Sequence, residues 1–271
     1  MTVPGTLDRY PDFPSRFVEP RPVDVWLPPG YDPAGEARYP VIYMHDGQNL
    51  FEPTHSLSGA DWGIAEALVR LIREGQTPGA IVVGIWCVEQ RVREYMPYKA
   101  LVSPQAVQRF VQAHGGEPWS DDYLRFLVGE VKPFIDAHYC TLPEQAHTFV
   151  MGSSMGGLIS LYALCEYPGL FAGAGCLSTH WPAGDGLVLD YLRRALPPPG
   201  RHRFYFDYGT ETLDAGYEPY QLQADQVMRA AGYRPGQDWI TRKFPGAEHS
   251  ERAWRQRVHL PLLFLLEGRI P

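Results

Sequence analysis

One serine in this chain has a sequence context that suits nucleophilic acyl transfer. Ser154 is the central residue of a Gly-x-Ser-x-Gly pattern that runs from Gly152 to Gly156, with a short apolar run before it and helix-period apolar residues after it. A strand that turns so sharply into a helix leaves the middle residue strained and exposed, and the glycines keep side chains out of the crossing. The pattern predicts Ser154 as a nucleophile. Ser153 is the competing hydroxyl, and a purely structural glycine-rich turn is the alternative interpretation.

A serine hydroxyl needs a general base to take its proton near neutral pH. His249 follows the last expected strand and precedes Ser250, which is expected to cap a terminal helix. His45 and His180 also follow expected strands, but both come too early for the chain order of nucleophile, acid and histidine. We therefore expect His249 to be the base.

The acid that orients the imidazole should lie after the expected strand 203–208. Three carboxylates are found there, at Asp207, Glu211 and Asp214. Asp207 is at the strand end, where it could equally bind backbone amides. Asp214 lies deeper in the loop and is the favoured candidate, with the other two left open.

An acyl transfer also produces an oxyanion, which two backbone N–H groups can stabilise. Met155 directly follows the expected nucleophile and begins a helix, so its N–H is one expected donor. The loop that follows the buried run 39–44 is expected to supply the other, from Gln48 or Gly47.

The elements that must position these groups alternate between strands and helices. Continuous apolar runs at 80–86 and 172–177 are typical of central parallel strands, and amphipathic segments lie between the runs. This predicts an α/β fold with a mostly parallel sheet, helices on both faces and no separate lid domain. The whole chain, 1–271, is expected to be one domain, with residues 1–16 as an irregular leader, 17–27 as an edge strand and 87–102 as a long irregular stretch.

Composition restricts the classes of partner. The formal net charge is −7, and the chain contains no block of Lys and Arg, which argues against nucleic acid or an anionic membrane as a partner. The N-terminus lacks the basic and apolar regions of a secretory signal, and the apolar tail 260–266 is too short to span a bilayer. Four scattered cysteines fit a reducing compartment, so a cytoplasmic location is expected. No metal-ligand cluster is recognisable, and no cofactor is expected.

The segments 41–51, 152–157 and 246–250 together resemble the putative esterase family of α/β-hydrolases. This family is related to feruloyl esterases, enterochelin esterases, S-formylglutathione hydrolases and the antigen 85 mycolyltransferases, and the resemblance extends from about residue 38 to 266. It implies Ser154 as the nucleophile, His249 as the base, and backbone donors at Gln48 and Met155. Many members keep the acid three positions after a glycine that corresponds to Gly209. That position is a threonine here, and some relatives use a Ser–His dyad.

The expected activity is hydrolysis of small to medium carboxylic esters through an acyl-enzyme on Ser154. An acyltransferase with the same nucleophile and a non-catalytic binding module on the same fold are the alternatives. The sequence indicates neither the natural ester nor the oligomeric state. Aromatic and charged residues expected on the same sheet edge are candidate substrate contacts. The preferred set is Trp62, Arg93, Tyr95, Trp181 and Tyr208, and further candidates are Trp86, Arg91 and Glu94.

Overall fold

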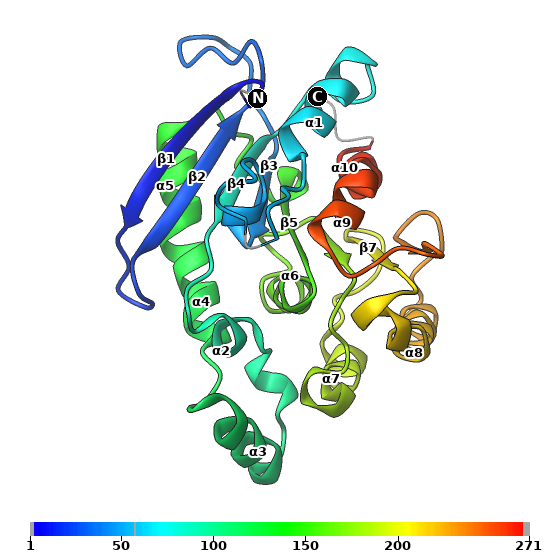
Figure 1. The fold of residues 1–271 in the computed structure, drawn as a ribbon. Helices are drawn as coiled ribbons and strands as arrows, with labels where there is room; N and C mark the ends of the chain where they lie inside the picture. Colours follow the sequence, from blue (N-terminus) through cyan, green and yellow to red (C-terminus); the bar gives the residue numbers. More distant parts are fainter. Residues whose placement is uncertain (1–2, 57, 268–271) are drawn as a thin grey trace.

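A single twisted sheet organises the molecule (Figure 1). The computed structural model describes residues 3–56 and 58–267, and within them the sheet has eight strands in the order β1-β2-β4-β3-β5-β6-β7-β8. The strands are β1 (Thr6–Phe13), β2 (Arg21–Leu27), β3 (Val41–His45), β4 (Ile81–Ile85), β5 (Thr148–Ser153), β6 (Gly173–Leu177), β7 (Arg203–Tyr208) and β8 (Trp239–Lys243).

The strands from β4 across to β8 pair in parallel, whereas β1 and β2 are antiparallel additions at one side. Every residue of β3, β4, β5 and β6 is buried, as expected for parallel strands covered on both faces. The prediction of a mostly parallel sheet is confirmed, and β8 is an edge strand as predicted.

The N-terminal prediction was wrong in two respects. Residues 6–13, expected to be irregular because of their prolines, form the edge strand β1, and β2 therefore lies between β1 and β4 instead of at the edge. The register shifts between Tyr10 and Phe13, opposite Pro22 of β2. Because a bulge interrupts the hydrogen-bond ladder there, the missing proline N–H is tolerated inside the sheet.

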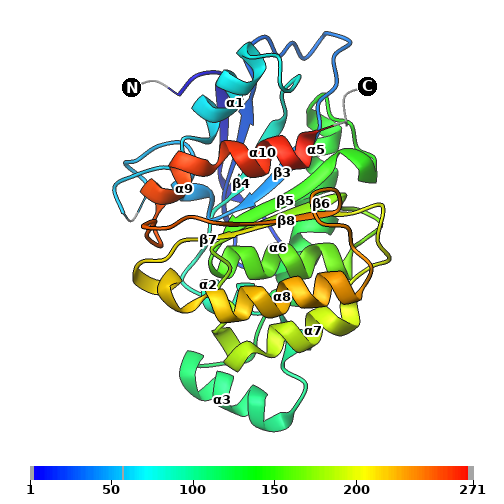
Figure 2. The same cartoon turned by 90° about the vertical axis from the view of Figure 1, so that its right-hand side faces the viewer.

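Helices cover both faces of the sheet. On one face lie α1 (Ile64–Arg73), α9 (Glu251–Arg257) and α10 (His259–Leu266), and on the other lie α4 (Ser120–Phe126), α5 (Lys132–His138), α6 (Met155–Glu166), α7 (Leu187–Ala195) and α8 (Glu218–Ala230). Figure 2 shows α10 on one side of the strands and α6, α7 and α8 on the other. A π-helical segment (Leu127–Val131) joins α4 to α5.

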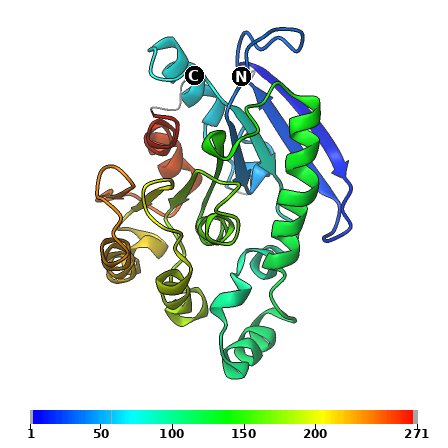
Figure 3. The same ribbon diagram turned by 180° about the vertical axis from the view of Figure 1, so that it is seen from behind.

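The α4–α5 segment covers the antiparallel part of the sheet. Figure 3 shows this green helix from behind, beside the blue strands β1 and β2. Phe13 of β1 makes edge-on ring contacts with Phe126 at 6.0 Å and with Phe134 at 5.1 Å between ring centroids. The N-terminal strand is thus held to the main body by the kind of aromatic packing that stabilises a core.

The stretch from 87 to 102, expected to be irregular, contains α2 (Arg91–Tyr95) and a short 3-10 turn (Tyr98–Ala100). The helix α3 (Pro104–His114) follows and projects at the bottom of Figure 1. Ser103 caps its N-terminus, because the Ser103 side chain accepts a hydrogen bond from the Ala106 N–H.

The parallel strands bring their carboxyl ends, and the loops that follow, to one edge of the sheet. β3 ends at His45, and the loops after β5, β6, β7 and β8 carry Ser154, Ser178, Asp214 and His249, respectively. This is the edge at which open α/β sheets bind ligands. Among the described residues, no helix is both long and apolar enough to cross a membrane.

Candidate active site

Ser154 occupies the turn between β5 and α6 in an unusual backbone conformation. Its φ is 57° and its ψ is −123°, values that a residue with a side chain rarely adopts. Its N–H donates to the Leu177 carbonyl at 2.9 Å, which ties the turn to the end of β6. A Cβ on Gly152 would lie 2.8 Å from the backbone of Gly156. The two glycines therefore allow strand and helix to meet this closely.

His249 lies on the loop after β8, where its Nδ1 is 2.6 Å from Oδ1 of Asp214. The other oxygen of Asp214 accepts hydrogen bonds from the Ser178 hydroxyl and the Gly209 N–H, both at 2.6 Å. Burial alone would raise the pKa of Asp214. The hydrogen bonds from His249, Ser178 and Gly209 outweigh that effect, so the pKa lies below the usual value for an aspartate. Asp214 is therefore a buried carboxylate that stays charged beside an imidazole.

The other two candidate acids have different surroundings. Asp207 is fully buried at the end of β7 and accepts hydrogen bonds from Arg257 at 3.1 and 3.2 Å and from the Ser178 N–H at 3.2 Å. Burial raises the pKa of Asp207, and the charge of Arg257 offsets the increase only in part. Glu211 is exposed. Of these three carboxylates, Asp214 is the one that contacts the His249 ring.

Thr212, which occupies the position where the resemblance described above would place the acid, contributes in another way. Its hydroxyl accepts a hydrogen bond from the His249 N–H at 2.8 Å, and its φ is 53°. The backbone of Gly209 comes so close to Ala247 that a Cβ would lie 2.1 Å from the Ala247 carbonyl oxygen. These contacts hold the loop after β7 against the loop that carries the histidine.

Tyr217 connects the region around Ser154 with the imidazole of His249. Its hydroxyl lies near the Ser154 side chain, which lowers the pKa of the phenol against the larger effect of burial, and its ring meets that of His249 edge-on, 5.7 Å between centroids. The same hydroxyl lies 2.5 Å from Nδ1 of His180, whose N–H donates to the Ser154 carbonyl at 3.1 Å. Ser154 and His249 therefore both lie near one tyrosine, although 95 positions separate them in the sequence.

The loop after β3 is held by an ion pair. Asp46 adopts a left-handed conformation with φ of 57°, and its carboxylate binds Arg91 through two hydrogen bonds of 2.6 and 2.7 Å. The Asp46 N–H donates to the Tyr95 hydroxyl at 3.2 Å. Two charge-assisted bonds in parallel fix orientation as well as distance. This pair therefore fixes the turn that precedes Gln48.

The two expected oxyanion donors begin helical turns. Gln48 lies in the 3-10 turn Gly47–Asn49, and its side chain both accepts from the Cys87 N–H at 3.1 Å and contacts the Cys87 sulfur at 3.0 Å. Met155 is the first residue of α6, where a backbone N–H has no carbonyl one turn earlier to bind.

Four of the five preferred substrate contacts are buried aromatic side chains, at Trp62, Tyr95, Trp181 and Tyr208. Trp62 packs against Trp254, with 5.4 Å between ring centroids, and Tyr95 binds the backbone of the loop after β3. Trp181 is 1% exposed and donates from its ring nitrogen to Gln221 at 2.9 Å. The polar atoms of Tyr95 and Trp181 are thus used within the protein, and contact of these two residues and of Trp62 with a substrate stays a prediction.

Tyr208 and Arg93 also bind other groups of the protein. The buried Tyr208 donates from its hydroxyl to Glu218 at 3.2 Å. Arg93 stacks over Trp119, 3.5 Å from the ring centroid, and donates to the Glu117 carbonyl at 2.9 Å. Both residues stay predictions as substrate contacts.

Motif reasoning missed several residues that support this site. Ser178 directly follows β6, and its hydroxyl accepts from the Trp254 ring nitrogen at 3.0 Å and from Arg257 at 2.9 Å. Tyr217 lies three residues after Asp214, and its N–H donates to the Asp214 carbonyl at 3.0 Å. The only sequence signal for both was their position on loops at the carboxyl edge of the sheet.

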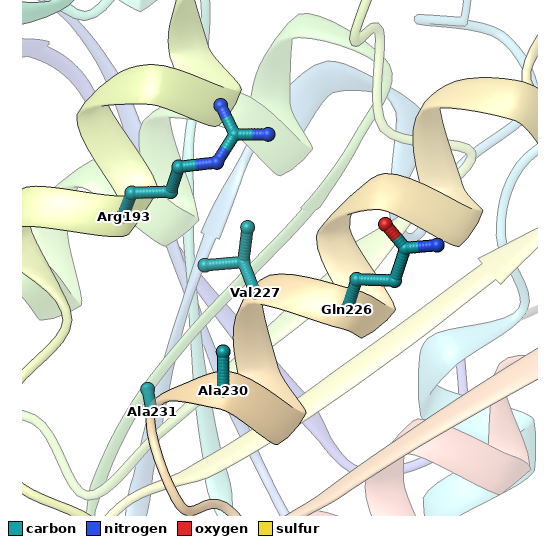
Figure 4. A pocket seen from close by; sticks show the side chains of 5 residues that line it. All are labelled: Arg193, Gln226, Val227, Ala230 and Ala231. Carbon is teal, nitrogen blue, oxygen red and sulfur yellow. The ribbon is translucent and has the colours of Figure 1, made fainter.

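A surface hollow of about 350 Å³ lies apart from these residues, between α7 and α8 (Figure 4). It is lined by Arg193, Gln226, Val227, Ala230 and Ala231. Figure 4 shows the Arg193 side chain extended over apolar side chains of α8. Because it holds no residue of the site and no nucleophile, we assign it no part in the chemistry.

Comparisons with known proteins agree on the class of fold. A sequence model of the family described as "Putative esterase" matches residues 15–259. The uncharacterised protein YbbA of Bacillus subtilis is 26% identical over 208 residues, which cover 76% of this chain and 73% of YbbA. The ferri-bacillibactin esterase BesA of the same organism is 26% identical over 193 residues, which cover 66% of this chain but only 61% of BesA.

Among solved structures, a ferulic acid esterase superposes with a TM-score of 0.71. The match covers 97% of this chain and 98% of that protein, at 18% sequence identity. At so low an identity the likeness shows the fold, and the fold is that of the α/β-hydrolases.

Proposed function

The chain belongs to the "Putative esterase" family and is a carboxylic-ester hydrolase, and from that premise we propose that it works through an acyl-enzyme formed on Ser154. The observation that carries the proposal is the bond of 2.6 Å between His249 and the buried Asp214, on loops that Tyr217 joins to Ser154. This arrangement has the three parts of a nucleophile, a base and a group that orients the base.

In the proposed reaction the Ser154 oxygen attacks the ester carbonyl carbon while Nε2 of His249 takes its proton. The tetrahedral intermediate collapses, the alkoxy group leaves with the proton from His249, and an acyl-enzyme remains. Water then attacks the acyl carbon and loses a proton to His249, which returns the proton to the Ser154 oxygen as that bond breaks. Asp214 keeps Nδ1–H directed away from the serine and stabilises the imidazolium.

The oxyanion of each intermediate would be stabilised by the backbone N–H groups of Met155 and Gln48. Support comes from the position of Met155 at the start of α6, where the helix dipole also favours negative charge. The Arg91–Asp46 pair and the side-chain bonds of Gln48 to Cys87 would keep the second donor in place. Rigid donors of this kind cost no reorganisation when the charge appears.

We propose small to medium esters of the type that an open site at the sheet edge can accept. Ferulic acid and ferri-bacillibactin esters are suitable first compounds, because proteins similar to this chain are named for them. Transfer of the acyl group to an alcohol instead of water would use the same acyl-enzyme. Product analysis with and without added alcohol decides between the two acceptors.

The experiment is a panel of esters, from p-nitrophenyl acetate to feruloyl and catecholate esters, assayed with wild type and Ser154→Ala. We expect the variant to lose about 10⁴-fold or more in kcat, as when a triad nucleophile is removed. Ser153→Ala is the matched control, since it removes a neighbouring buried hydroxyl and should stay within a few-fold of wild type. Retention of most hydrolysis by Ser154→Ala would refute the proposal.

A further inference from the structure

A second imidazole and a phenol lie beside the proposed nucleophile, on the elements that also hold the histidine and the acid. Tyr217 is 2% exposed and follows Asp214 by one 3-10 turn. The Tyr217 hydroxyl lies 2.5 Å from Nδ1 of His180, and its ring packs edge-on against that of His249, which places the phenol near the Ser154 side chain. The His180 N–H in turn donates to the Ser154 carbonyl at 3.1 Å. Ser154, Tyr217 and His180 are thus neighbours of one another. The roles proposed for His249 and Asp214 leave Tyr217 and His180 without a function.

The proton positions in this group follow from the proposed chemistry. For reaction, the Ser154 hydroxyl must direct its hydrogen to Nε2 of His249, so its oxygen accepts the hydrogen bond and Tyr217 donates it. The Tyr217 oxygen then accepts from Nδ1–H of His180. Burial, together with the nearby charges of His249 and Arg91, lowers the pKa of His180. This favours the neutral imidazole, which carries one N–H, and here that hydrogen is on Nδ1.

We propose that Tyr217 is a further catalytic residue, which donates a hydrogen bond to the Ser154 oxygen, and that His180 is the positioning residue that orients the phenol. The proposal rests on the acyl-enzyme mechanism stated above. The Ser154 oxygen carries negative charge at two moments: when His249 removes its proton during attack, and when its bond to the acyl carbon breaks during deacylation. A fixed donor stabilises the oxygen at both moments.

No proton passes from Tyr217 in this scheme. The electron pair of the breaking bond returns to the Ser154 oxygen, the proton comes back from His249, and the phenol stays protonated. Burial, to which the charge of Asp214 adds, raises the pKa of Tyr217 above its usual value, which suits a permanent donor. The phenol is buried between the imidazole rings of His180 and His249, with 5.7 Å between its centroid and that of each ring. Protein contacts, and not water, therefore fix its orientation.

The test is the steady-state kinetics of Tyr217→Phe with a p-nitrophenyl ester. Loss of one donor to a reacting oxygen should lower kcat about tenfold, while KM stays within about twofold. Tyr233→Phe is the matched control. Tyr233 lies just after the C-terminal end of α8, and its buried hydroxyl donates to the Pro197 carbonyl at 2.8 Å. The control should keep the wild-type kcat. A wild-type kcat in Tyr217→Phe would overturn the proposal.

The role of His180 is read from a double-mutant cycle. His180→Ala should lower kcat by a similar factor, and the double variant with Tyr217→Phe should be no slower than the worse single variant, since both changes remove one hydrogen bond. His180→Asn, which offers an amide N–H near the position of Nδ1, should restore part of kcat. Independent, multiplying losses would contradict the assignment and leave His180 a purely structural residue.

Failure of this inference is distinguishable from failure of the mechanism. If Tyr217→Phe has the wild-type kcat while Ser154→Ala is inactive, only the role of Tyr217 is refuted. If Ser154→Ala is also fully active, the acyl-enzyme itself is refuted. Thermal unfolding of each variant shows whether a lost activity comes with a lost fold.

Discussion

Two buried aspartates on one short segment, Asp207 and Asp214, have opposite surroundings. Asp207 lies at the end of β7 against a buried guanidinium, and its pKa is raised mainly by burial. Asp214 lies in the following 3-10 turn against an imidazole, and its pKa is lowered because hydrogen bonds outweigh burial. The comparison teaches that the balance between burial and hydrogen bonding sets the direction of each pKa shift: burial outweighs the charge of Arg257 at Asp207, whereas hydrogen bonds outweigh burial at Asp214.

One residue links the two regions. Ser178 donates from its backbone to Asp207 and from its hydroxyl to Asp214. Its hydroxyl also accepts from Arg257, the cation that pairs with Asp207. A network of this kind couples its members, so we expect a change at one carboxylate to affect the other through this serine.

The largest expected effect separates the aspartates by activity. Asp214→Asn should lower kcat/KM by about 10³ to 10⁴-fold, because the amide no longer fixes the imidazole tautomer. The folded state should persist, since the amide oxygen can still accept a hydrogen bond. Ester hydrolysis and thermal unfolding measure the two quantities. If activity stays near wild type, a Ser–His dyad is the better description.

The next effect is expected in stability. Asp207→Asn replaces one acceptor oxygen by an NH2 donor that faces the buried Arg257 guanidinium, which leaves N–H groups of a charged side chain unpaired at a cost of about 3 kcal/mol or more of the free energy of unfolding. Denaturant unfolding measures this loss, while kcat of the folded variant should stay within a few-fold of wild type. Asp225→Asn is the matched control, because that buried carboxylate accepts from the neutral Gln221 and Thr241. Equal losses in both variants would contradict the role assigned to Arg257.

A smaller effect is expected at the residue that joins the two regions. Ser178→Ala removes a donor to Asp214 and an acceptor for Trp254 and Arg257. Both properties should respond, with kcat about tenfold lower and the free energy of unfolding lower by about 1–3 kcal/mol. Kinetics and denaturant unfolding on the same sample test this. A change in only one property would show that the two carboxylates are not linked through Ser178.

The smallest effect is the dependence of stability on pH. The lowered pKa of Asp214 means that its contribution to stability is complete above the ordinary carboxyl pKa, about 3.9, and is lost as pH falls through the folded value. The raised pKa of Asp207 has the opposite sign, so its burial costs stability at neutral pH and the cost disappears as pH falls.

This difference is measured by urea unfolding from pH 7 to pH 3. Relative to Asp207→Asn, wild type should gain stability as pH falls toward about 3.9. Relative to Asp214→Asn, wild type should change little in that window and lose stability below it. If the difference in free energy of unfolding between wild type and each variant changed with pH in the same direction and over the same pH range, the pKa shifts of the two aspartates would be contradicted.

The sequence was most informative where pattern and context agreed. The predicted range of β7 coincides with the observed one, and the turn at Ser154 has the strained backbone that the glycine pattern predicted. Asp214 was favoured only for its depth in the loop, and the structure pairs it with the histidine. Residue spacing could not predict the role of Thr212. Its hydroxyl accepts a hydrogen bond from the His249 backbone N–H, and such a bond leaves no sequence pattern.

The rest depended on contacts between distant segments. The proline-rich start of the chain reads as irregular until the bulge beside Pro22 shows how a strand accommodates it. Arg91 and Tyr217 belong to no motif, and only the assembled loops bring them to Asp46 and Ser154. The sequence also could not show which aromatic residues belong to the core and which line a pocket. Trp181 was expected on a loop as a substrate contact, and it is buried.

The central claim is that Ser154 becomes covalently acylated, and active-site phosphonylation tests it most directly. The protein is treated with a fluorophosphonate and digested, and the modified residue is located by mass spectrometry. The account predicts one phosphonate on the peptide that contains Ser154, no modification in Ser154→Ala, and much slower labelling in His249→Ala. Labelling of Ser154→Ala at the wild-type rate would contradict it.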